Sequence, residues 1–424
     1  MKTTEGKRIG SQVRGVEQSW QLYERAAHYI PMGTQTHSKA PRAHLRTREP
    51  CFIVRGKGCR VWDLDGNEYI DLRNGLGPIT LGYGFPAVDA ALRRQLESGT
   101  VFSYAHPLEV EVAASLAAVI PCAESVRFLK TGGESMAAVH RLARAFTGRD
   151  HILTCGYHGW LNTTTRAGVP AAIRSVYQAF PWGDIDSCAR EFAQNPEGIA
   201  AVSVACGYGD IAAGDTFLPA LRELSRQYGA LLIFDEIVTG FRLRLGGAQE
   251  YFGVVPDLAV FAKGMSNGVP LSCYLGRREI MDRVEDVSIS STYGGDALGL
   301  AAAAAVLQTY GAEDVIGTLW QRGQQLHEGF GILCRELGIA AGFKGLPPVG
   351  ELVFEHADPA RRTELFVRFN AEVLKRGLIV YSVCYPNYSH TSADIEEALA
   401  IIEEALIAMR EEGVFEGAHP VTGE

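Results

Sequence analysis

Residues 231–264 read LLIFDEIVTGFRLRLGGAQEYFGVVPDLAVFAKG, and this stretch contains two short apolar runs that each lead to a charged residue. The run 231–234 ends at Asp235, and the run 258–261 ends just before Lys263. Short apolar runs of this kind are typical of strands buried inside an α/β sheet. Because ligands bind beyond the carboxyl ends of the strands in such a sheet, we expect the carboxylate and the amine to share one cleft.

Asp235 and Lys263 have the chemistry that pyridoxal 5'-phosphate (PLP) requires. A lysine that forms a Schiff base with an aldehyde cofactor must be deprotonated part of the time, which burial promotes. A carboxylate beside the pyridine nitrogen keeps that nitrogen protonated, so that the ring can accept electrons. Either residue alone is commonplace, since aspartates cap helices and lysines lie in solvated loops. Their occurrence 28 positions apart, each behind its own apolar run, favours both as catalytic residues.

The chain around this stretch predicts an α/β fold with a large central domain. Between residues 85 and 310, helical patterns alternate with short apolar segments, which is typical of a mostly parallel sheet flanked by helices. The expected strands are 125–129, 152–154, 200–204, 231–234, 258–261 and 272–275.

The two ends of the chain predict a smaller α/β domain. Residues 1–84 contain a helical pattern at 16–29 and an alternating pattern at 52–72 around the turn Asp65-Gly66-Asn67, which indicates a β-hairpin or small meander. Residues 311–424 mix helices with two expected strands. We therefore divide the chain into 1–84, 85–310 and 311–424.

Composition restricts the class of partner. The 424 residues carry a net charge of −9, with 40 basic and 49 acidic residues, which argues against a nucleic-acid surface and favours small molecules. Nine scattered cysteines with no CxxC pair favour neither disulfides nor a metal site, and a reducing cytoplasm is expected. No apolar stretch approaches the roughly 20 residues that cross a membrane.

Three further motifs are suited to a phosphorylated, flat cofactor. Gly132 and Gly133 follow an expected strand and open a helix, where free amides attract phosphate. Tyr157 follows another strand and could stack on a ring, while Thr292 precedes a glycine turn and could bind phosphate. Each also has an ordinary explanation, as a plain helix start, a core aromatic or a loop residue.

Several motifs together resemble a known family. IFDEIVTGFR, FAKGMSNGVPL, TGGES, YHGW and STYGG make the chain similar, over nearly its full length, to class III, ornithine-aminotransferase-like PLP enzymes of fold type I. IPMGTQTHSKAP and GKGCRVWDLDGNEYID resemble the branch that holds glutamate-1-semialdehyde aminomutase and the amino-sugar and aminoglycoside aminotransferases. This resemblance implies a large domain with a mostly parallel seven-stranded sheet and a small domain from both termini.

The resemblance also implies residue roles. Lys263 would be the Schiff-base lysine, and Asp235 would lie at the pyridine nitrogen. Tyr157 would stack on the ring, and the amides of Gly132 and Gly133 would bind the phosphate. Thr292 would bind the phosphate of the neighbouring subunit, which implies a homodimer with shared active sites.

The chain departs from the family pattern at two places. Where the family usually has Glu-Pro after the strand ending at Val204, this chain has Ala205-Cys206, and Asp296-Ala297 replaces Asn-Pro after the STYGG motif. Loss of the glutamate leaves room or a different polarity on the substrate side, which suits a bulky polyhydroxylated substrate.

Three functions follow. The first is transfer of an amino group from an amino donor, glutamate or glutamine, to a carbonyl acceptor, an oxo-sugar or aminoglycoside in antibiotic biosynthesis, by a ping-pong mechanism. The second is isomerisation, as a glutamate-1-semialdehyde 2,1-aminomutase or an epimerase at an amine-bearing carbon. The third is a non-enzymatic regulator on the same fold, against which the presence of both Lys263 and Asp235 argues.

Overall fold

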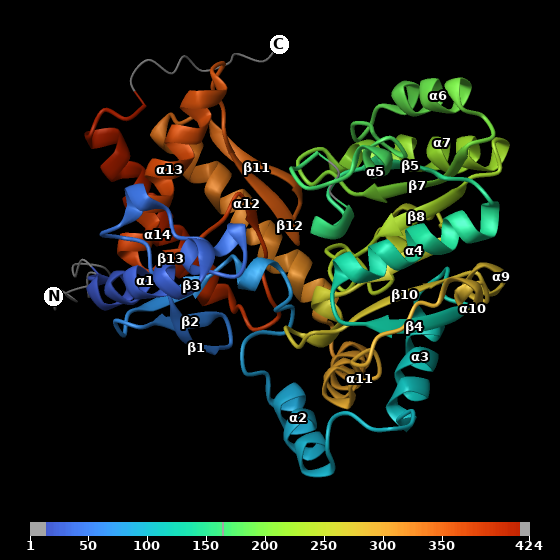
Figure 1. Ribbon diagram of the computed structural model, residues 1–424. Coiled ribbons are helices and arrows are strands. Elements are labelled where there is room, and N and C mark those ends of the chain that lie inside the picture. Colours follow the sequence, from blue (N-terminus) through green and yellow to red (C-terminus); the bar gives the residue numbers. More distant parts are fainter. Residues whose placement is uncertain (1–13, 163–164, 416–424) are drawn as a thin grey trace, which may run out of the picture. The chain divides into compact units, whose positions relative to one another are not determined.

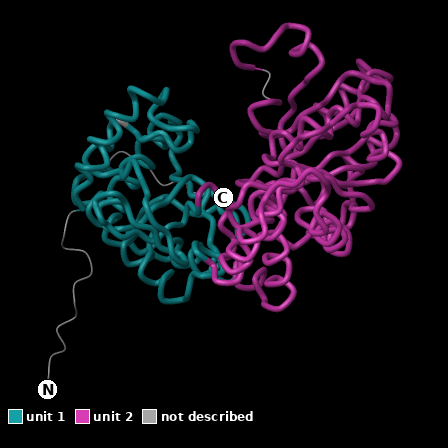
Figure 2. The backbone as a smooth tube through the Cα atoms, turned by 60° about the horizontal axis from the view of Figure 1, so that its bottom comes forward, with its two compact units in different colours: residues 1–74, 82–84, 321–424 teal, residues 75–81, 85–320 magenta. Residues whose placement is uncertain are grey.

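The computed structural model describes residues 14–162 and 165–415, which form two compact units (Figure 2). The smaller unit is built from Met1–Asn74, Gly82–Gly84 and Gln321–Glu424. The larger unit is built from Gly75–Leu81 and Phe85–Trp320. The short segment 75–81 thus belongs by its contacts to the larger unit, although the chain on both sides of it belongs to the smaller one.

A seven-stranded sheet forms the centre of the larger unit (Figure 1). Its strands are β4 (Ser125–Leu129), β5 (His151–Cys155), β6 (Tyr177–Ala179), β7 (Ile199–Ala205), β8 (Leu231–Asp235), β9 (Leu258–Phe261) and β10 (Ser272–Gly276). They lie in the order β4-β10-β9-β8-β7-β5-β6, and only β10 runs antiparallel to its neighbours. The predicted fold class, with a large, mostly parallel seven-stranded sheet, is confirmed.

Helices flank this sheet. They are α2 (Pro86–Ser98), α3 (Pro107–Val119), α4 (Gly132–Thr147), α5 (Ala171–Arg174), α6 (Ile185–Gln194), α7 (Gly214–Gln227), α8 (Ala248–Phe252), α9 (Arg278–Met281), α10 (Val284–Val287), α11 (Ala297–Ala312) and the start of α12 (Val315–Leu337). Helix α4 runs along the sheet, and its Met136, Val139 and Leu142 are buried in one cluster with Ile233 and Val260 of the central strands (Figure 1). This packing fixes the start of α4 relative to the strand ends.

The smaller unit contains two sheets. The first has the order β1-β2-β3-β13, formed by β1 (Ile53–Lys57), β2 (Arg60–Asp63), β3 (Glu68–Asp71) and β13 (Leu378–Ile379). The second is formed by β11 (Ala341–Leu346), β12 (Val349–Phe354) and β14 (Val383–Cys384). Its long helices are α1 (Glu17–Tyr29), the remainder of α12, α13 (Pro359–Arg376) and α14 (Ser392–Glu411).

Seven short 3-10 turns complete the structure: η1 (Pro31–Gly33), η2 (His37–Lys39), η3 (Ala43–Leu45), η4 (Asn74–Leu76), η5 (Trp160–Asn162), η6 (Ile211–Ala213) and η7 (Lys263–Ser266). In the described part of the chain, no helix is both long and apolar enough to cross a bilayer. Nor do the described ranges contain a group of three or more His, Cys, Asp or Glu residues placed to hold a metal ion.

Candidate active site

Lys263 begins the single turn η7 directly beyond β9, and its surroundings favour a neutral amine. Burial is the main cause that lowers the pKa of its amine to about 8, with the carboxylate of Asp235 acting in the opposite direction and Arg242 adding a smaller lowering effect. The backbone of Lys263 has a φ of 41°, in the left-handed region that residues other than glycine rarely adopt. Lys263 therefore combines a desolvated amine with a backbone conformation that is unusual for a lysine.

Asp235 is the last residue of β8, which pairs in parallel with β9, so that its carboxylate and Lys263 follow neighbouring strands. The side chain is buried, with 8% of the residue exposed. One carboxylate oxygen lies 2.9 Å from Nδ1 of His158, and the other accepts a hydrogen bond from the Ile237 amide at 3.1 Å. These contacts hold the carboxylate in one orientation.

His158 is a site residue that the sequence did not reveal. Its Nε2 lies 3.2 Å from the carbonyl oxygen of Ser203, so each ring nitrogen lies within hydrogen-bond distance of an oxygen atom. The ring thus links Asp235 to the backbone of β7, the next strand of the sheet. His158 stands inside the YHGW motif, but nothing in that motif shows that a strand distant in the sequence supplies its partner.

Gly132 and Gly133 form the first turn of α4, beyond β4. Thr131 caps this helix: its hydroxyl accepts from the Glu134 amide, and Glu134 in turn accepts from the Thr131 amide. In the described chain, neither glycine amide has a hydrogen-bond acceptor, as expected for the first turn of a helix. The predicted phosphate turn therefore has the geometry of an anion site, a helix start with two free amides, and the side chain of Ile237 packs against Gly132.

Tyr157 lies on the loop after β5, and 70% of the residue is exposed. The ring is therefore not a core aromatic. The loop passes close to the start of α4, because a Cβ added at Gly159 would lie only 2.7 Å from Cα of Gly133. Asn162 joins the two segments by donating to the carbonyl oxygens of Gly133 and His158.

The strand order brings five of the six predicted site residues to one edge of the sheet. Strands β4, β5, β8 and β9 all run in the same direction, so their carboxyl ends share an edge. The residues that follow these ends are Gly132, Gly133, Tyr157, Asp235 and Lys263. Among the contacts in the described chain, none joins Thr292 to this group. Thr292 is exposed on the loop before α11.

The two departures from the family pattern lie beside these residues. Cys206 helps to line a small cavity together with Asp235, and burial raises the pKa of its thiol well above the usual value. Asp296 caps α11 and forms an ion pair with Lys130, with 2.8 Å between Nζ and Oδ2. A short neutral side chain thus replaces the expected glutamate after β7, and a charged pair joins the phosphate turn to the loop carrying Thr292.

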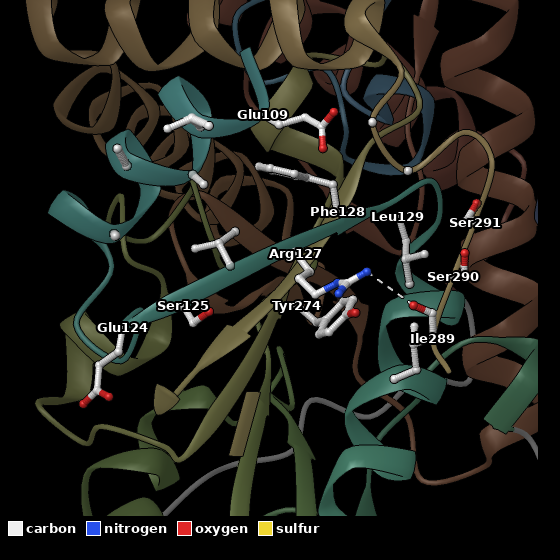
Figure 3. A pocket seen from close by; sticks show the side chains of 17 residues that line it. Glu109, Glu124, Ser125, Arg127, Phe128, Leu129, Tyr274, Ile289, Ser290 and Ser291 are labelled. Carbon is white, nitrogen blue, oxygen red and sulfur yellow. Dashed lines mark hydrogen bonds between the residues drawn. The ribbon is translucent and has the colours of Figure 1, made fainter. Parts of the chain in front are cut away.

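A separate open groove of about 680 Å³ lies next to that loop (Figure 3). It is lined by one side of α3, by the edge strand β4 and by residues 289–295. Arg127 crosses it and donates to the carbonyl oxygen of Ile289 at 3.3 Å (Figure 3). The predicted catalytic residues do not line this groove.

The donor set at the strand ends fits PLP. A desolvated amine suits an aldehyde, a buried oriented carboxylate suits a protonated ring nitrogen, and a glycine turn with free amides suits a phosphate. A Cβ at Gly159 would collide with the backbone of Gly133, so the loop after β5 approaches the glycine turn as closely as it does only because residue 159 has no side chain. This fold with this set of groups defines a PLP-dependent transferase of fold type I.

The family profile described as aminotransferase class-III matches residues 42–406, and the chain belongs to this family. It is 34% identical over 426 residues to the glutamate-1-semialdehyde 2,1-aminomutase of Syntrophomonas wolfei, covering 92% of this chain and 98% of the relative. It is 30% identical over 403 residues to the 3-aminobutyryl-CoA aminotransferase of Cloacimonas acidaminovorans, covering 92% and 97%.

Solved structures agree with this assignment. The FumI protein of Sphingopyxis sp. MTA144, solved with PLP, superposes with a TM-score of 0.88 at 27% identity, over 95% of this chain and 99% of that one. A β-phenylalanine aminotransferase from Variovorax paradoxus gives a TM-score of 0.83 at 25% identity, over 93% and 95%. The protein is a PLP-dependent enzyme of the class III aminotransferase family.

Proposed function

We propose that the protein transfers an amino group from glutamate or glutamine to the carbonyl of an oxo-sugar or aminoglycoside, by two half-reactions that share one cofactor. The observation that carries the proposal is the buried Lys263 amine, with a pKa of about 8, on the strand next to the Asp235–His158 pair. When bound, PLP supplies an aldehyde that takes up amines and a ring that withdraws electrons from the adjacent carbon.

In this proposal the side chains of the chain itself do the rest. Lys263 would hold the cofactor through its amine and, when that amine is free, would move a proton from and to the reacting carbon as general base and acid. Asp235, oriented by His158, keeps a proton at the ring nitrogen. Gly132 and Gly133 bind the phosphate through their amides, and Tyr157 covers one face of the ring.

The class of acceptor rests on the departure after β7. Ala205-Cys206 places a methyl group and a thiol where the family usually has glutamate and proline. Ala205 provides no carboxylate to bind a charged substrate group, and burial raises the pKa of the neighbouring Cys206 thiol well above its usual value. A bulky, neutral, hydroxyl-rich acceptor is compatible with this change.

The homodimer is part of the proposal. Thr292 and Tyr293 project from the loop before α11 with the ring 60% exposed, and the groove of Figure 3 lies beside them. Tyr104, between α2 and α3, is 90% exposed. Exposed aromatic groups beside a groove are typical of protein interfaces, and a second subunit would let Thr292 reach its phosphate.

A spectroscopic experiment tests the transferase. Wild type, Lys263→Ala and the surface control Lys344→Ala are loaded with PLP, then given glutamate or glutamine, then a panel of oxidised aminoglycosides and glutamate semialdehyde. We expect wild type and Lys344→Ala, but not Lys263→Ala, to show the absorbance of lysine-linked PLP, lost on adding the donor and restored by an oxo-sugar.

The same experiment tests the isomerase, which the aminomutase relative favours. If donors leave the absorbance unchanged while one amino substrate is rearranged or epimerised without a second substrate, the protein is an isomerase and the transferase proposal is wrong. If Lys263→Ala still showed the absorbance of lysine-linked PLP, another lysine would hold the cofactor and the assignment of Lys263 to this role would be wrong.

A further inference from the structure

The lysine turn η7 has an unusual backbone at both ends. Lys263 has a φ of 41° and Asn267, directly after the turn, has a φ of 48°. Residues other than glycine occupy this left-handed region only where their surroundings hold them there. The direction in which the Lys263 side chain leaves the backbone therefore depends on what packs against η7.

The segment 75–81 packs against this turn. The Thr80 hydroxyl donates to the carbonyl oxygen of Gly264 at 3.3 Å, and the Leu81 amide donates to the Asn267 side-chain oxygen at 2.9 Å. Both Thr80 and Leu81 are completely buried. A Cβ added at Gly264 would lie 2.8 Å from the Thr80 methyl carbon, so the two segments touch without space for another atom.

The far end of the segment is anchored by a buried arginine. Arg242 donates from its guanidinium to the carbonyl oxygen of Gly77 at 2.7 Å, and 1% of the residue is exposed. Arg242 is also one of the charges that act on the amine of Lys263. The segment is thus bonded at Gly77, Thr80 and Leu81, and two of these three bonds end on the lysine turn.

We propose that Thr80 and Asn267 are positioning residues for Lys263: through segment 75–81 they hold the left-handed turn that aims the amine into the site. The inference rests on the proposed role of Lys263 as the residue that holds the cofactor. Neither side chain needs to touch the cofactor or the substrate. Loosening either contact lets the turn relax and the amine move, while the chemistry of the amine itself is unchanged.

The test compares two buried threonines. Thr80→Val keeps the shape of the side chain and removes the hydroxyl, while Thr80→Ser keeps the hydroxyl. Thr309→Val makes the same change at another buried threonine, whose hydroxyl donates to the carbonyl oxygen of Ala305 at 2.8 Å within α11. The full-length proteins are loaded with PLP and compared in thermal unfolding, single-turnover reaction with the amino donor, and absorbance against pH.

We expect Thr80→Val to slow the single-turnover rate about tenfold or more with a nearly unchanged KM, because a small misplacement of a reacting group is costly. The midpoint pH of the lysine-linked absorbance should rise by about half a unit or more, since the nitrogen that joins Lys263 to PLP becomes better solvated and its protonated form is favoured. Thr80→Ser should restore both values. Thr309→Val should lose stability without changing either.

A second pair of variants, at Asn267, tests the same proposal even if Thr80→Val fails to fold. Asn267→Gly allows the left-handed backbone but removes the acceptor for the Leu81 amide, whereas Asn267→Asp retains an acceptor. We expect the glycine variant to reproduce the slow rate and the shifted midpoint, and the aspartate variant to stay near wild type.

The proposal is overturned if Thr80→Val and Asn267→Gly lose only stability, as Thr309→Val does. A wild-type protein with no PLP on Lys263 would overturn the proposed function, and this inference with it. That failure is distinguishable, because it is visible in the wild-type spectrum before any variant is compared.

Discussion

A lysine amine with a pKa of about 8 reacts over a different pH range from a lysine in water. Only the neutral amine attacks an aldehyde, so the rate at which cofactor-free protein links PLP to Lys263 should rise with pH, pass its midpoint near pH 8 and then level off. The exposed Lys344 serves as the comparison. Borohydride trapping followed by peptide mass spectrometry measures both lysines in one sample. Equal midpoints would show that burial does not activate Lys263.

At the scale of single residues, the sequence revealed Lys263 and Asp235 because each follows an apolar run that identifies a strand end. It did not reveal His158 as the partner of Asp235, because the contact joins the loop after β5 to the end of β8. The left-handed conformation of Lys263 could not be predicted either, because the surrounding structure imposes it against the residue's own preference.

The loop after β5 lies against the start of helix α4, and Gly159 and Gly133 make this contact. Gly159 has a φ of 84°, and a side chain there would meet the backbone of Gly133. Gly159→Ala should therefore push the loop carrying Tyr157 away from the phosphate turn and weaken PLP binding about tenfold or more, which corresponds to about 1.4 kcal/mol. Titration of cofactor-free protein with PLP measures the loss.

Gly168→Ala is the matched control for this change. Gly168 has a φ of 86°, but nothing lies within 4 Å of an added Cβ. It therefore carries the same backbone strain without the collision, and its PLP affinity should stay near that of wild type. If Gly159→Ala and Gly168→Ala lost PLP affinity to the same extent, backbone strain alone would explain the effect.

The start of α11 depends on Asp296, which caps the helix and pairs with Lys130. Asp296→Ala removes the cap and leaves the Lys130 ammonium without its carboxylate, so the free energy of unfolding should fall by about 1 to 2 kcal/mol. Asp296→Asn keeps a capping oxygen and should lose less than half of that amount. Chemical denaturation measures both variants, and an alanine variant as stable as wild type would contradict the role of the cap.

The sequence predicted most strands of the large sheet but omitted β6, and in the smaller unit it omitted β11. Strand β6 has only three residues at the sheet edge, and its sequence YQA has no apolar run. Strand β11, AGFKGL, contains two glycines, which are rare in strands, and is paired only because β12 lies beside it. The antiparallel direction of β10 was not predictable either, because an apolar run has the same composition in both directions.

At the scale of the whole molecule, the proposed homodimer with shared active sites predicts complementation between subunits. In a mixed dimer of Lys263→Ala and Thr292→Val, one site carries both changes, while the other has an intact lysine and an intact threonine from its neighbour. Refolding an equal mixture should therefore restore about a quarter of the wild-type sites, since half of the dimers are mixed and each has one complete site. Active-site titration measures this fraction. No recovery would mean that Thr292 does not act across subunits.

The smaller unit is assembled from distant parts of the chain, and this affects its synthesis. Strand β3 pairs with β13 through Ile70 and Leu378, about 300 residues apart. At roughly 5 to 20 residues per second, the ribosome needs on the order of 15 to 60 seconds between them. Throughout that interval the edge of β3 and its apolar face await residues not yet translated, while the ribosome makes the larger unit. The nascent amino-terminal segment is therefore the part of this protein most in need of a chaperone.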